Sequence, residues 1–347
     1  MCSKPLVIVD PHFRRMDEIF APADRARLHD LVDVVWGKDE PMPVADARAA
    51  LADALAIICA DWRYGDALSY ASSLHAILTV SGGFPRTIDY EMCFAKGIRV
   101  LSAAPAFARS VAEMALGLAL AAGRDIVTGD REMRTGGERW LHAGNAEAFM
   151  LYGKPIGMIG YGGIAQQLHP LLTPFGCPIR VYDPWLAPGY LRGKGVEPVD
   201  LEPLLATSKV IFVMAAPSVE NRALLSRELL EQIQPGAVLV LVSRAHVVDF
   251  DALTKLVLAG RFKAAIDVFP TEPLEADHPL RRAEYAILSA HKAGPTVEGC
   301  WEIGAMLVDD LEAIVKGLPP QRLLTAQPEL ISRYAINTIK TQPPDKK

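Results

Sequence analysis

Cysteine is scarce in this sequence of 347 residues. The five cysteines lie far apart, at Cys2, Cys59, Cys93, Cys177 and Cys300. Their odd number and the lack of a Cys-x-x-Cys pair argue against a disulfide framework and against a zinc site. We therefore expect buried free thiols in the reducing environment of the cytoplasm.

The sequence also lacks the features that mark export, membrane insertion and nucleic-acid binding. Residues 1–10 do not have the order of basic, apolar and small residues that is typical of a signal peptide. The longest apolar run, residues 111–122, contains Glu113 and is shorter than the ~20 residues that a membrane-spanning helix needs. The formal net charge is −5 and Lys and Arg form no block, which disfavours a nucleic-acid partner. We expect a soluble, cytoplasmic protein with neither a membrane nor a nucleic acid as partner.

Alternating strands and helices are what the sequence has in quantity. Hydrophobic residues make up 50% and charged residues 22%, and the length is sufficient for roughly two globular domains. Apolar runs predict a first series of strands at residues 5–10, 33–36, 56–60, 75–80 and 98–101, with helices at 23–31, 45–54 and 88–96. A second series has strands at 155–159, 179–182, 210–214, 238–242, 264–267 and 286–288, with helices at 163–172, 201–206, 227–233, 250–259 and 298–315. This alternation favours two doubly wound, parallel α/β units.

The segment between the two series differs from both. An apolar helix is expected after Ser110, a candidate N-cap, and it runs to about Ala122. The polar residues 128–149 then predict an exposed helix and a connecting loop. Residues 331–347 are expected to form a frayed, flexible tail.

A glycine-rich loop follows the first strand of the second series. Gly160 permits the tight turn of Gly160-Tyr-Gly-Gly-Ile-Ala165, and Gly162 allows the backbone to approach a pyrophosphate at the start of the next helix. The following strand ends at Asp183, at the interval where a carboxylate binds the ribose hydroxyls and disfavours a 2′-phosphate. The loop therefore predicts a dinucleotide site that prefers NAD to NADP. A plain turn residue before Pro184 is the alternative for Asp183.

Three further strand ends carry an arginine, a glutamate and a histidine. Arg244 can bind a carboxylate with its planar guanidinium, and His291 is of a residue type that exchanges protons near neutral pH. Glu272 could bond the second imidazole nitrogen of His291, which would orient the ring and stabilise its protonated form. Singly each could be a structural residue, but after a dinucleotide loop we interpret them together as catalytic. Asp267 could either cap a helix or contact the nicotinamide carboxamide.

These segments resemble the D-isomer-specific 2-hydroxyacid dehydrogenase family. The resemblance covers roughly residues 75–300, and its most specific parts are Asp267-Val-Phe-Pro-Thr-Glu-Pro273 and the Arg–Glu–His spacing. It implies a Rossmann NAD-binding domain at 109–295, and a flavodoxin-like substrate domain at 1–108 completed by 296–330, with a cleft between them. Trp140 lies where the family usually has tryptophan.

The resemblance also implies what each residue does. Arg244 would bind the substrate carboxylate and keto oxygen, and His291, paired with Glu272, would be the acid/base for hydride transfer to a 2-keto acid. Backbone N–H groups of Ser81, Gly82 and Gly83 would bind the substrate carboxylate, with Arg86 as a further candidate. The cofactor-binding set comprises Gly160, Tyr161, Gly162, Gly163, Ile164, Asp183, Ala216, Val242, Ser243, Asp267 and Gly294, with no metal.

The sequence departs from the family pattern around the catalytic residues. Ala245 replaces the glycine that usually follows the arginine, Ala290 replaces the usual proline, and Lys292 adds a positive charge beside His291. The loop at Phe84, Pro85 and Arg86 is one residue longer than the usual family pattern. These changes leave the substrate open among glyoxylate, hydroxypyruvate, phosphoglycerate and related acids.

Other functions stay open beside the dehydrogenase. The fold also occurs in NAD(H)-responsive transcriptional co-regulators, which bind without turnover. Formate dehydrogenase shares the fold as well, but its different polar constellation is not evident here. The apolar helix and the arm at 128–149 have more hydrophobic surface than a monomer covers, and the resemblance implies a homodimer.

Overall fold

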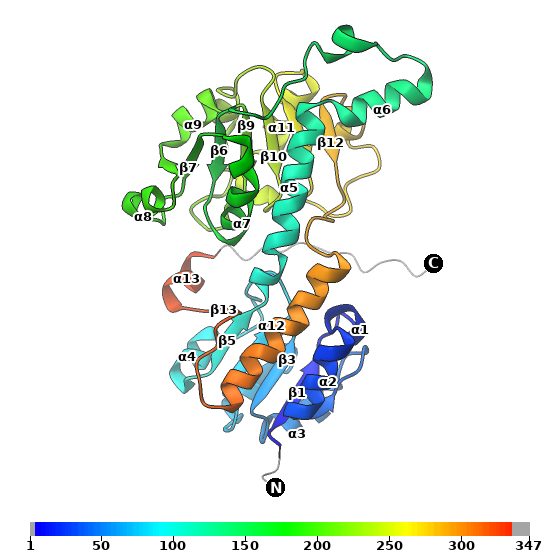
Figure 1. Cartoon of the computed structure of the whole chain (residues 1–347). Coiled ribbons are helices and arrows are strands. Elements are labelled where there is room, and N and C mark those ends of the chain that lie inside the picture. Colours follow the sequence, from blue (N-terminus) through cyan, green and yellow to red (C-terminus); the bar gives the residue numbers. More distant parts are fainter. Residues whose placement is uncertain (1–3, 335–347) are drawn as a thin grey trace. The chain divides into compact units, whose positions relative to one another are not determined.

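The computed structural model describes residues 4–334, which form two compact units (Figure 1). Unit 1 contains residues 4–108 and 294–334, and unit 2 contains residues 109–293. Each unit has its own sheet and its own hydrophobic core. The predicted class of two doubly wound α/β domains is confirmed.

Unit 1 is built on a six-stranded sheet in the order β13-β5-β4-β3-β1-β2. Its strands are β1 (Leu6–Asp10), β2 (Asp33–Trp36), β3 (Ala56–Cys59), β4 (Ala76–Thr79), β5 (Arg99–Ser102) and β13 (Leu324–Thr325). Its helices are α1 (Met16–Ile19), α2 (Pro22–Leu31), α3 (Val44–Leu51), α4 (Tyr90–Lys96), α12 (Val297–Val315) and α13 (Pro328–Arg333), with 3-10 turns η1 (Gly65–Ser69) and η2 (Ala104–Phe107). Strands β1 to β5 are parallel in flavodoxin-like order, and β13 is antiparallel to β5.

The two-residue period of the strands explains the layers of unit 1. Val7 and Val9 of β1 pack in one core with α1, α2 and α12, while Ile8 packs in another with α3 and α4. Because both faces of β1 are buried, its sequence is a continuous apolar run, as in other parallel sheets covered by helices.

Unit 2 is built on a seven-stranded parallel sheet in the order β12-β11-β10-β9-β6-β7-β8. Its strands are β6 (Ile156–Ile159), β7 (Ile179–Tyr182), β8 (Glu197–Pro198), β9 (Val210–Val213), β10 (Val238–Leu241), β11 (Lys263–Ile266) and β12 (Ala286–Leu288). Its helices are α5 (Ala108–Gly123), α6 (Ile126–Thr135), α7 (Gly163–Leu172), α8 (Pro188–Gly193), α9 (Leu201–Thr207), α10 (Arg227–Leu230) and α11 (Phe250–Leu258), with η3 (Leu141–Asn145), η4 (Thr173–Phe175), η5 (Ala245–Val247) and η6 (Pro279–Arg282). This is the Rossmann order, and the direction of winding changes between β6 and β9.

The helix between the two series starts earlier than expected and belongs to a longer helical segment than expected. The helix α5 begins at Ala108, so Ser110 is inside it and is no N-cap; its hydroxyl instead donates to the Ala293 carbonyl at 2.6 Å. With η2 the helical segment spans Ala104–Gly123, which within the described residues is the one segment long and apolar enough to cross a membrane by length and composition. Half of its apolar window is buried, and core helices of soluble proteins meet the same criterion.

The C-terminal tail also differs from the expectation. Helix α13 extends to Arg333, so the first residues of the expected flexible tail are helical. Residues 335–347 lie outside the described residues. Strand β13 was not predicted, because a strand of two residues carries no periodicity.

Candidate active site

Three neighbouring strand ends bring the predicted catalytic residues to one edge of the sheet in unit 2. Arg244 follows β10, Glu272 lies in the loop after β11, and His291 follows β12. These strands are adjacent and parallel, so their carboxyl ends share an edge. Ligands of open α/β sheets bind at this edge.

His291 and Glu272 form a close pair. The Nδ1 atom of His291 is 2.7 Å from Oε2 of Glu272, and the other carboxylate oxygen accepts the Phe269 N–H at 3.0 Å. Burial by itself raises the pKa of the Glu272 carboxyl, but the hydrogen bonds from His291 and Phe269 and the charges of His291 and Arg244 outweigh it. The pKa of Glu272 is therefore lowered, and the carboxylate stays ionised beside the imidazole.

The backbone of His291 is held by the buried Asp267. The Asp267 carbonyl accepts the His291 N–H at 2.9 Å, and the two carboxylate oxygens accept the N–H groups of Lys292 and Ala293 at 2.9 and 3.1 Å. His291 itself has φ +51°, a left-handed conformation that is unusual for a residue other than glycine. Strain of this kind persists only where the surroundings fix it, and it is concentrated at functional sites. Asp267 thus closes the loop of His291 and does not cap a helix, since the N-cap of the next helix, α12, is Thr296.

Arg244 lies close enough to Glu272 for its charge to lower the pKa of that carboxyl. Its Nη1 donates to the Ser243 carbonyl at 2.7 Å.

The neighbouring His246 was not predicted as a site residue. Its Nε2 is 2.9 Å from the Ser218 carbonyl. His246 thereby ties the segment of Arg244 to the loop after β9. Nothing in the spacing pointed to it, because Ser218 is far away in the sequence.

The glycine loop has the shape that a dinucleotide needs. Gly160 has φ +87°, and a Cβ there would lie 2.6 Å from the Ala215 Cα, so only glycine fits. A Cβ at Gly162 would meet nothing within 4 Å, so this side of the loop is open at the start of α7. Asp183 accepts the Tyr161 N–H at 2.8 Å, which places the predicted ribose-binding carboxylate against the loop.

Other members of the predicted cofactor set lie around the same edge. The Ser243 hydroxyl is buried and has no hydrogen-bond partner within the described residues, which is the signature of a polar group that a ligand satisfies. Val242 is buried beside it, and Ala216 lies in the loop after β9, where its carbonyl accepts Asn221 at 2.7 Å. Gly163 and Ile164 form the first turn of α7. These residues fit a dinucleotide on the side where the winding of the sheet reverses.

The predicted substrate loop belongs to unit 1. Ser81, Gly82 and Gly83 follow β4, and the Ser81 hydroxyl donates to the Gly83 carbonyl at 3.1 Å. Within residues 4–334, the N–H groups of Gly82 and Gly83 have no hydrogen-bond acceptor, so they are available to an anion. Arg86 is exposed in the same loop.

Gly294, which was predicted to bind the cofactor, lies in unit 1. A Cβ added at this position would lie 3.1 Å from the Phe107 ring.

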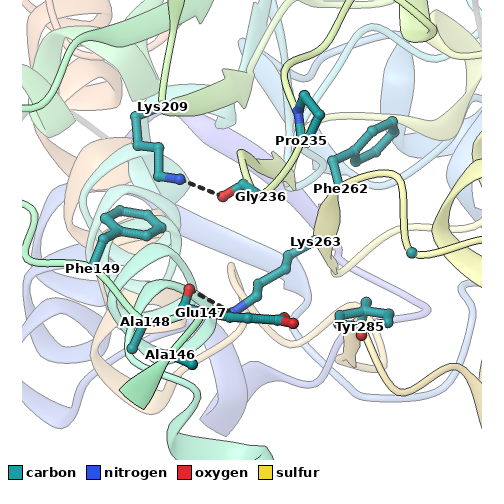
Figure 2. Close-up of a pocket in the computed structure, with 11 residues that line it drawn as sticks. Ala146, Glu147, Ala148, Phe149, Lys209, Pro235, Gly236, Phe262, Lys263 and Tyr285 are labelled. Atoms are coloured by element: carbon teal, nitrogen blue, oxygen red, sulfur yellow. Dashed lines mark hydrogen bonds between the residues drawn. The ribbon is translucent and has the colours of Figure 1, made fainter. Parts of the chain in front are cut away.

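A cavity in unit 2 is separate from these residues. It has a volume of about 420 Å³ and is lined by residues that precede β9, β10, β11 and β12, together with the end of the arm (Figure 2). It therefore lies at the amino ends of the strands, whereas Arg244, Glu272 and His291 lie at the carboxyl ends. Its lysines are already bonded: Lys209 donates to the Gly236 carbonyl at 2.7 Å and Lys263 to Asp125 at 2.5 Å. We do not assign the reaction to this cavity.

Among the described residues, no group of three or more His, Cys, Asp or Glu side chains could hold a metal ion. The cysteines Cys59, Cys93 and Cys300 are buried free thiols, as expected, whereas Cys177 is a free thiol that is only partly buried. Cys2 lies outside the described residues.

Comparison with known proteins agrees with this geometry. Residues 116–293 match the family described as D-isomer specific 2-hydroxyacid dehydrogenase, NAD binding domain. D-3-phosphoglycerate dehydrogenase of Mycobacterium tuberculosis is 29% identical over 298 residues, which cover 86% of this chain and 56% of that protein. This chain thus spans about half the length of the curated relatives of that name.

Two other similar proteins are matched over most of their length. Glyoxylate reductase of Aeropyrum pernix is 31% identical over 301 residues, covering 84% of this chain and 89% of that protein. The crystal structure of a phosphoglycerate oxidoreductase from Rhizobium etli has 38% identity and a TM-score of 0.86, covering 95% of this chain and 100% of that chain. The chain belongs to the D-isomer specific 2-hydroxyacid dehydrogenase family and contains the NAD-binding domain of that family.

Proposed function

We propose that this protein is an NAD-dependent oxidoreductase that interconverts a small 2-keto acid and its D-2-hydroxy acid. The observation that carries the proposal is the 2.7 Å pair of His291 and Glu272 on the same sheet edge as Arg244, in a unit with a glycine loop open for a dinucleotide. Family membership supports the reaction type.

Each residue has a role that its surroundings support. Arg244 binds the substrate carboxylate and stabilises the charge that develops on the keto oxygen. His291 donates a proton to that oxygen in reduction and accepts it in oxidation, while Glu272 fixes the ring through Nδ1. Gly160, Gly162 and Asp183 would hold the dinucleotide, which supplies or accepts the hydride when it is bound.

The test is a panel of 2-keto acids with NADH and NADPH compared side by side. We expect NADH oxidation with at least one 2-keto acid, and its loss in H291A and in R244A. If the wild type turns over no keto acid of the panel faster than H291A does, the proposed dehydrogenase activity is refuted. Tight NADH binding without turnover, together with a captured protein partner, would favour the co-regulator instead.

We further propose that the protein is a homodimer joined through unit 2. Helix α6 buries none of its residues, and Trp140 and Leu141 of the arm are 69% and 84% exposed. An apolar surface of this kind is typical of a protein interface, and a second copy of unit 2 is the partner that the resemblance implies. Light scattering should show a dimer for the wild type and a monomer for L141D. A monomeric wild type at micromolar concentration would refute the dimer.

We also propose a cytoplasmic location. The free thiols Cys59, Cys93, Cys177 and Cys300 support a reducing compartment. Fractionation of the cells that produce the protein tests this, and recovery in a membrane or extracellular fraction would contradict it.

A further inference from the structure

A buried carboxylate lies at the carboxyl edge of the sheet in unit 1. Asp10 ends β1 and is completely buried in register with Cys59 of β3. One of its oxygens accepts hydrogen bonds from Arg63 and from the Tyr64 hydroxyl, and the other accepts the Met42 N–H at 3.2 Å. A buried charge needs such partners, so Asp10 fixes the position of Arg63.

The guanidinium of Arg63 is only partly used by this pair. Its side chain is 31% exposed, and within residues 4–334 its only hydrogen-bond partner is Asp10. Several N–H donors of the guanidinium therefore remain for a ligand. Because Asp10 already holds the side chain, a ligand binds Arg63 with little further loss of side-chain entropy.

The loop of Arg63 is joined to the predicted substrate loop. The Trp62 N–H donates to the Thr87 hydroxyl at 2.9 Å, and the Val80 N–H donates to the Cys59 carbonyl at 3.0 Å. Strands β3 and β4 are neighbours, so the loops that follow them share one rim of the sheet. Arg63 thus lies on the same rim as the unbonded N–H groups of Gly82 and Gly83.

We propose that Arg63 selects substrates that carry a second anionic group, a carboxylate or a phosphate, on the carbon chain beyond the 2-keto acid. This proposal rests on the proposed function, in which the backbone N–H groups of the substrate loop at Ser81, Gly82 and Gly83 bind the first carboxylate. A guanidinium binds either anion through paired N–H groups, which explains why an arginine anchored by a buried acid suits this role.

The other charged side chains of the rim define the selectivity. Asp61 is exposed, and its carboxylate is 3.4 Å from the Thr87 hydroxyl, so it opposes an anion. Arg86 is exposed and adds a positive charge. The negative charge of Asp61 offsets the positive charge of Arg86 at this rim. The preference for an anionic substrate therefore depends on Arg63.

The experiment compares pairs of 2-keto acids that differ only in the distal group. The pairs are 2-oxopentanedioate with 2-oxopentanoate, oxaloacetate with 2-oxobutanoate, and the 3-phosphate of hydroxypyruvate with hydroxypyruvate. We expect the wild type to have the higher kcat/KM for the anionic member of at least one pair. R63M should lower that value by about 10- to 100-fold, the loss expected for one charge-assisted contact. The uncharged member should change by less than about twofold, which is within the ordinary effect of a surface substitution.

Control variants separate specificity from folding. The substitution R63M leaves the buried negative charge of Asp10 without its positively charged partner. The double variant D10N/R63M removes that charge and should show the same selective loss. R63K should retain part of the preference, because it keeps the charge without the fork. The control R27M removes another ion-paired arginine of unit 1, on α2, and should leave the ratio unchanged.

The outcomes are distinct for the two proposals. A wild type that turns over the uncharged members as well as the anionic ones refutes the role of Arg63 and leaves the dehydrogenase standing. An equal loss for both members in D10N/R63M, with the protein folded, also refutes it. No turnover of any member with NADH or NADPH refutes the proposed function and this inference with it.

Discussion

Replacing Glu272 by glutamine gives the sharpest test of the catalytic pair. The substitution keeps the size of the side chain and one oxygen, which can still accept from His291 Nδ1, but it removes the negative charge and the acceptor of the Phe269 N–H. The wild-type contact is 2.7 Å long, and the carboxylate is largely buried, so solvent screens it little. The loss of charge should therefore weaken the stabilisation of the protonated imidazole without moving the ring.

The magnitude follows from the two kinds of hydrogen bond. A bond to a charged partner contributes roughly 1.5–3 kcal/mol, and a neutral one about 0.5–1.5 kcal/mol. The difference, about 1–1.5 kcal/mol, corresponds to about one pH unit. Reduction requires the protonated His291, so the alkaline limb of its pH–rate profile should move about one unit to lower pH in E272Q.

The assay is the initial rate of NADH oxidation across pH with a saturating keto acid. Above the wild-type limb, E272Q should be about tenfold slower, whereas well below it the two proteins should have similar rates. Oxidation requires the neutral imidazole. The acidic limb of the pH–rate profile for oxidation should therefore also move to lower pH, which leaves E272Q more active than the wild type at low pH. The matched control is E275Q, which removes a charge from an exposed position in the same loop.

Two results would refute this reasoning. A uniform decrease at all pH values, with no movement of the limb, would mean that Glu272 only maintains structure. An unchanged profile would mean that His291 is not the proton donor, whatever its distance from Glu272.

Four further predictions follow from the same site. R244A should lower kcat/KM by about 100- to 1000-fold, as expected for a lost oxyanion contact, while the Kd for NADH measured by fluorescence stays within about twofold. D183S should reduce the preference for NADH over NADPH in KM, because the carboxylate no longer repels the 2′-phosphate; an unchanged ratio would contradict the role of Asp183. D267N should lower the free energy of unfolding by about 1–3 kcal/mol, measured with urea, because a buried acceptor of Lys292 and Ala293 becomes an amide that cannot accept both bonds. The folded-state pKa of Glu272 is lowered, so its contribution to stability is present above the ordinary value of 4.5 and is lost as pH falls through the folded value. The gap in unfolding free energy between wild type and E272Q should accordingly shrink as the pH falls below that value, and a constant gap would contradict the lowered pKa.

The sequence allowed the central strands to be predicted because each is a short apolar run between turn residues. The predicted bounds of β2, β7 and β12 agree with the structure residue for residue. The elements β8, β13 and α1 could not be predicted, since none of them is an apolar run between turn residues. The start of α5 was wrong for a related reason. Ser110 is a residue type that favours an N-cap, but it donates instead to Ala293, which is distant in the sequence.

The candidate site shows the same division. Arg244, Glu272 and His291 could be proposed because each follows a predicted strand, and neighbouring parallel strands end at one edge. The pairing of Asp10 with Arg63 could not be proposed, because β1 and β3 become neighbours only through the crossover order of the sheet. A residue that acts through a contact between distant segments gives no local signal.

Asp267 explains how His291, the proposed acid/base, is held in a costly conformation. A left-handed backbone costs a residue with a Cβ roughly 1–2 kcal/mol. The three bonds from His291, Lys292 and Ala293 to Asp267 each contribute about 0.5–1.5 kcal/mol, so their sum is of the size needed to offset that cost. Asp267 follows β11, the neighbour of the strand β10 that precedes Arg244. The backbone of His291 is therefore tied to the sheet through Asp267, while Glu272 holds its ring through Nδ1, so two separate carboxylates fix the two parts of this residue.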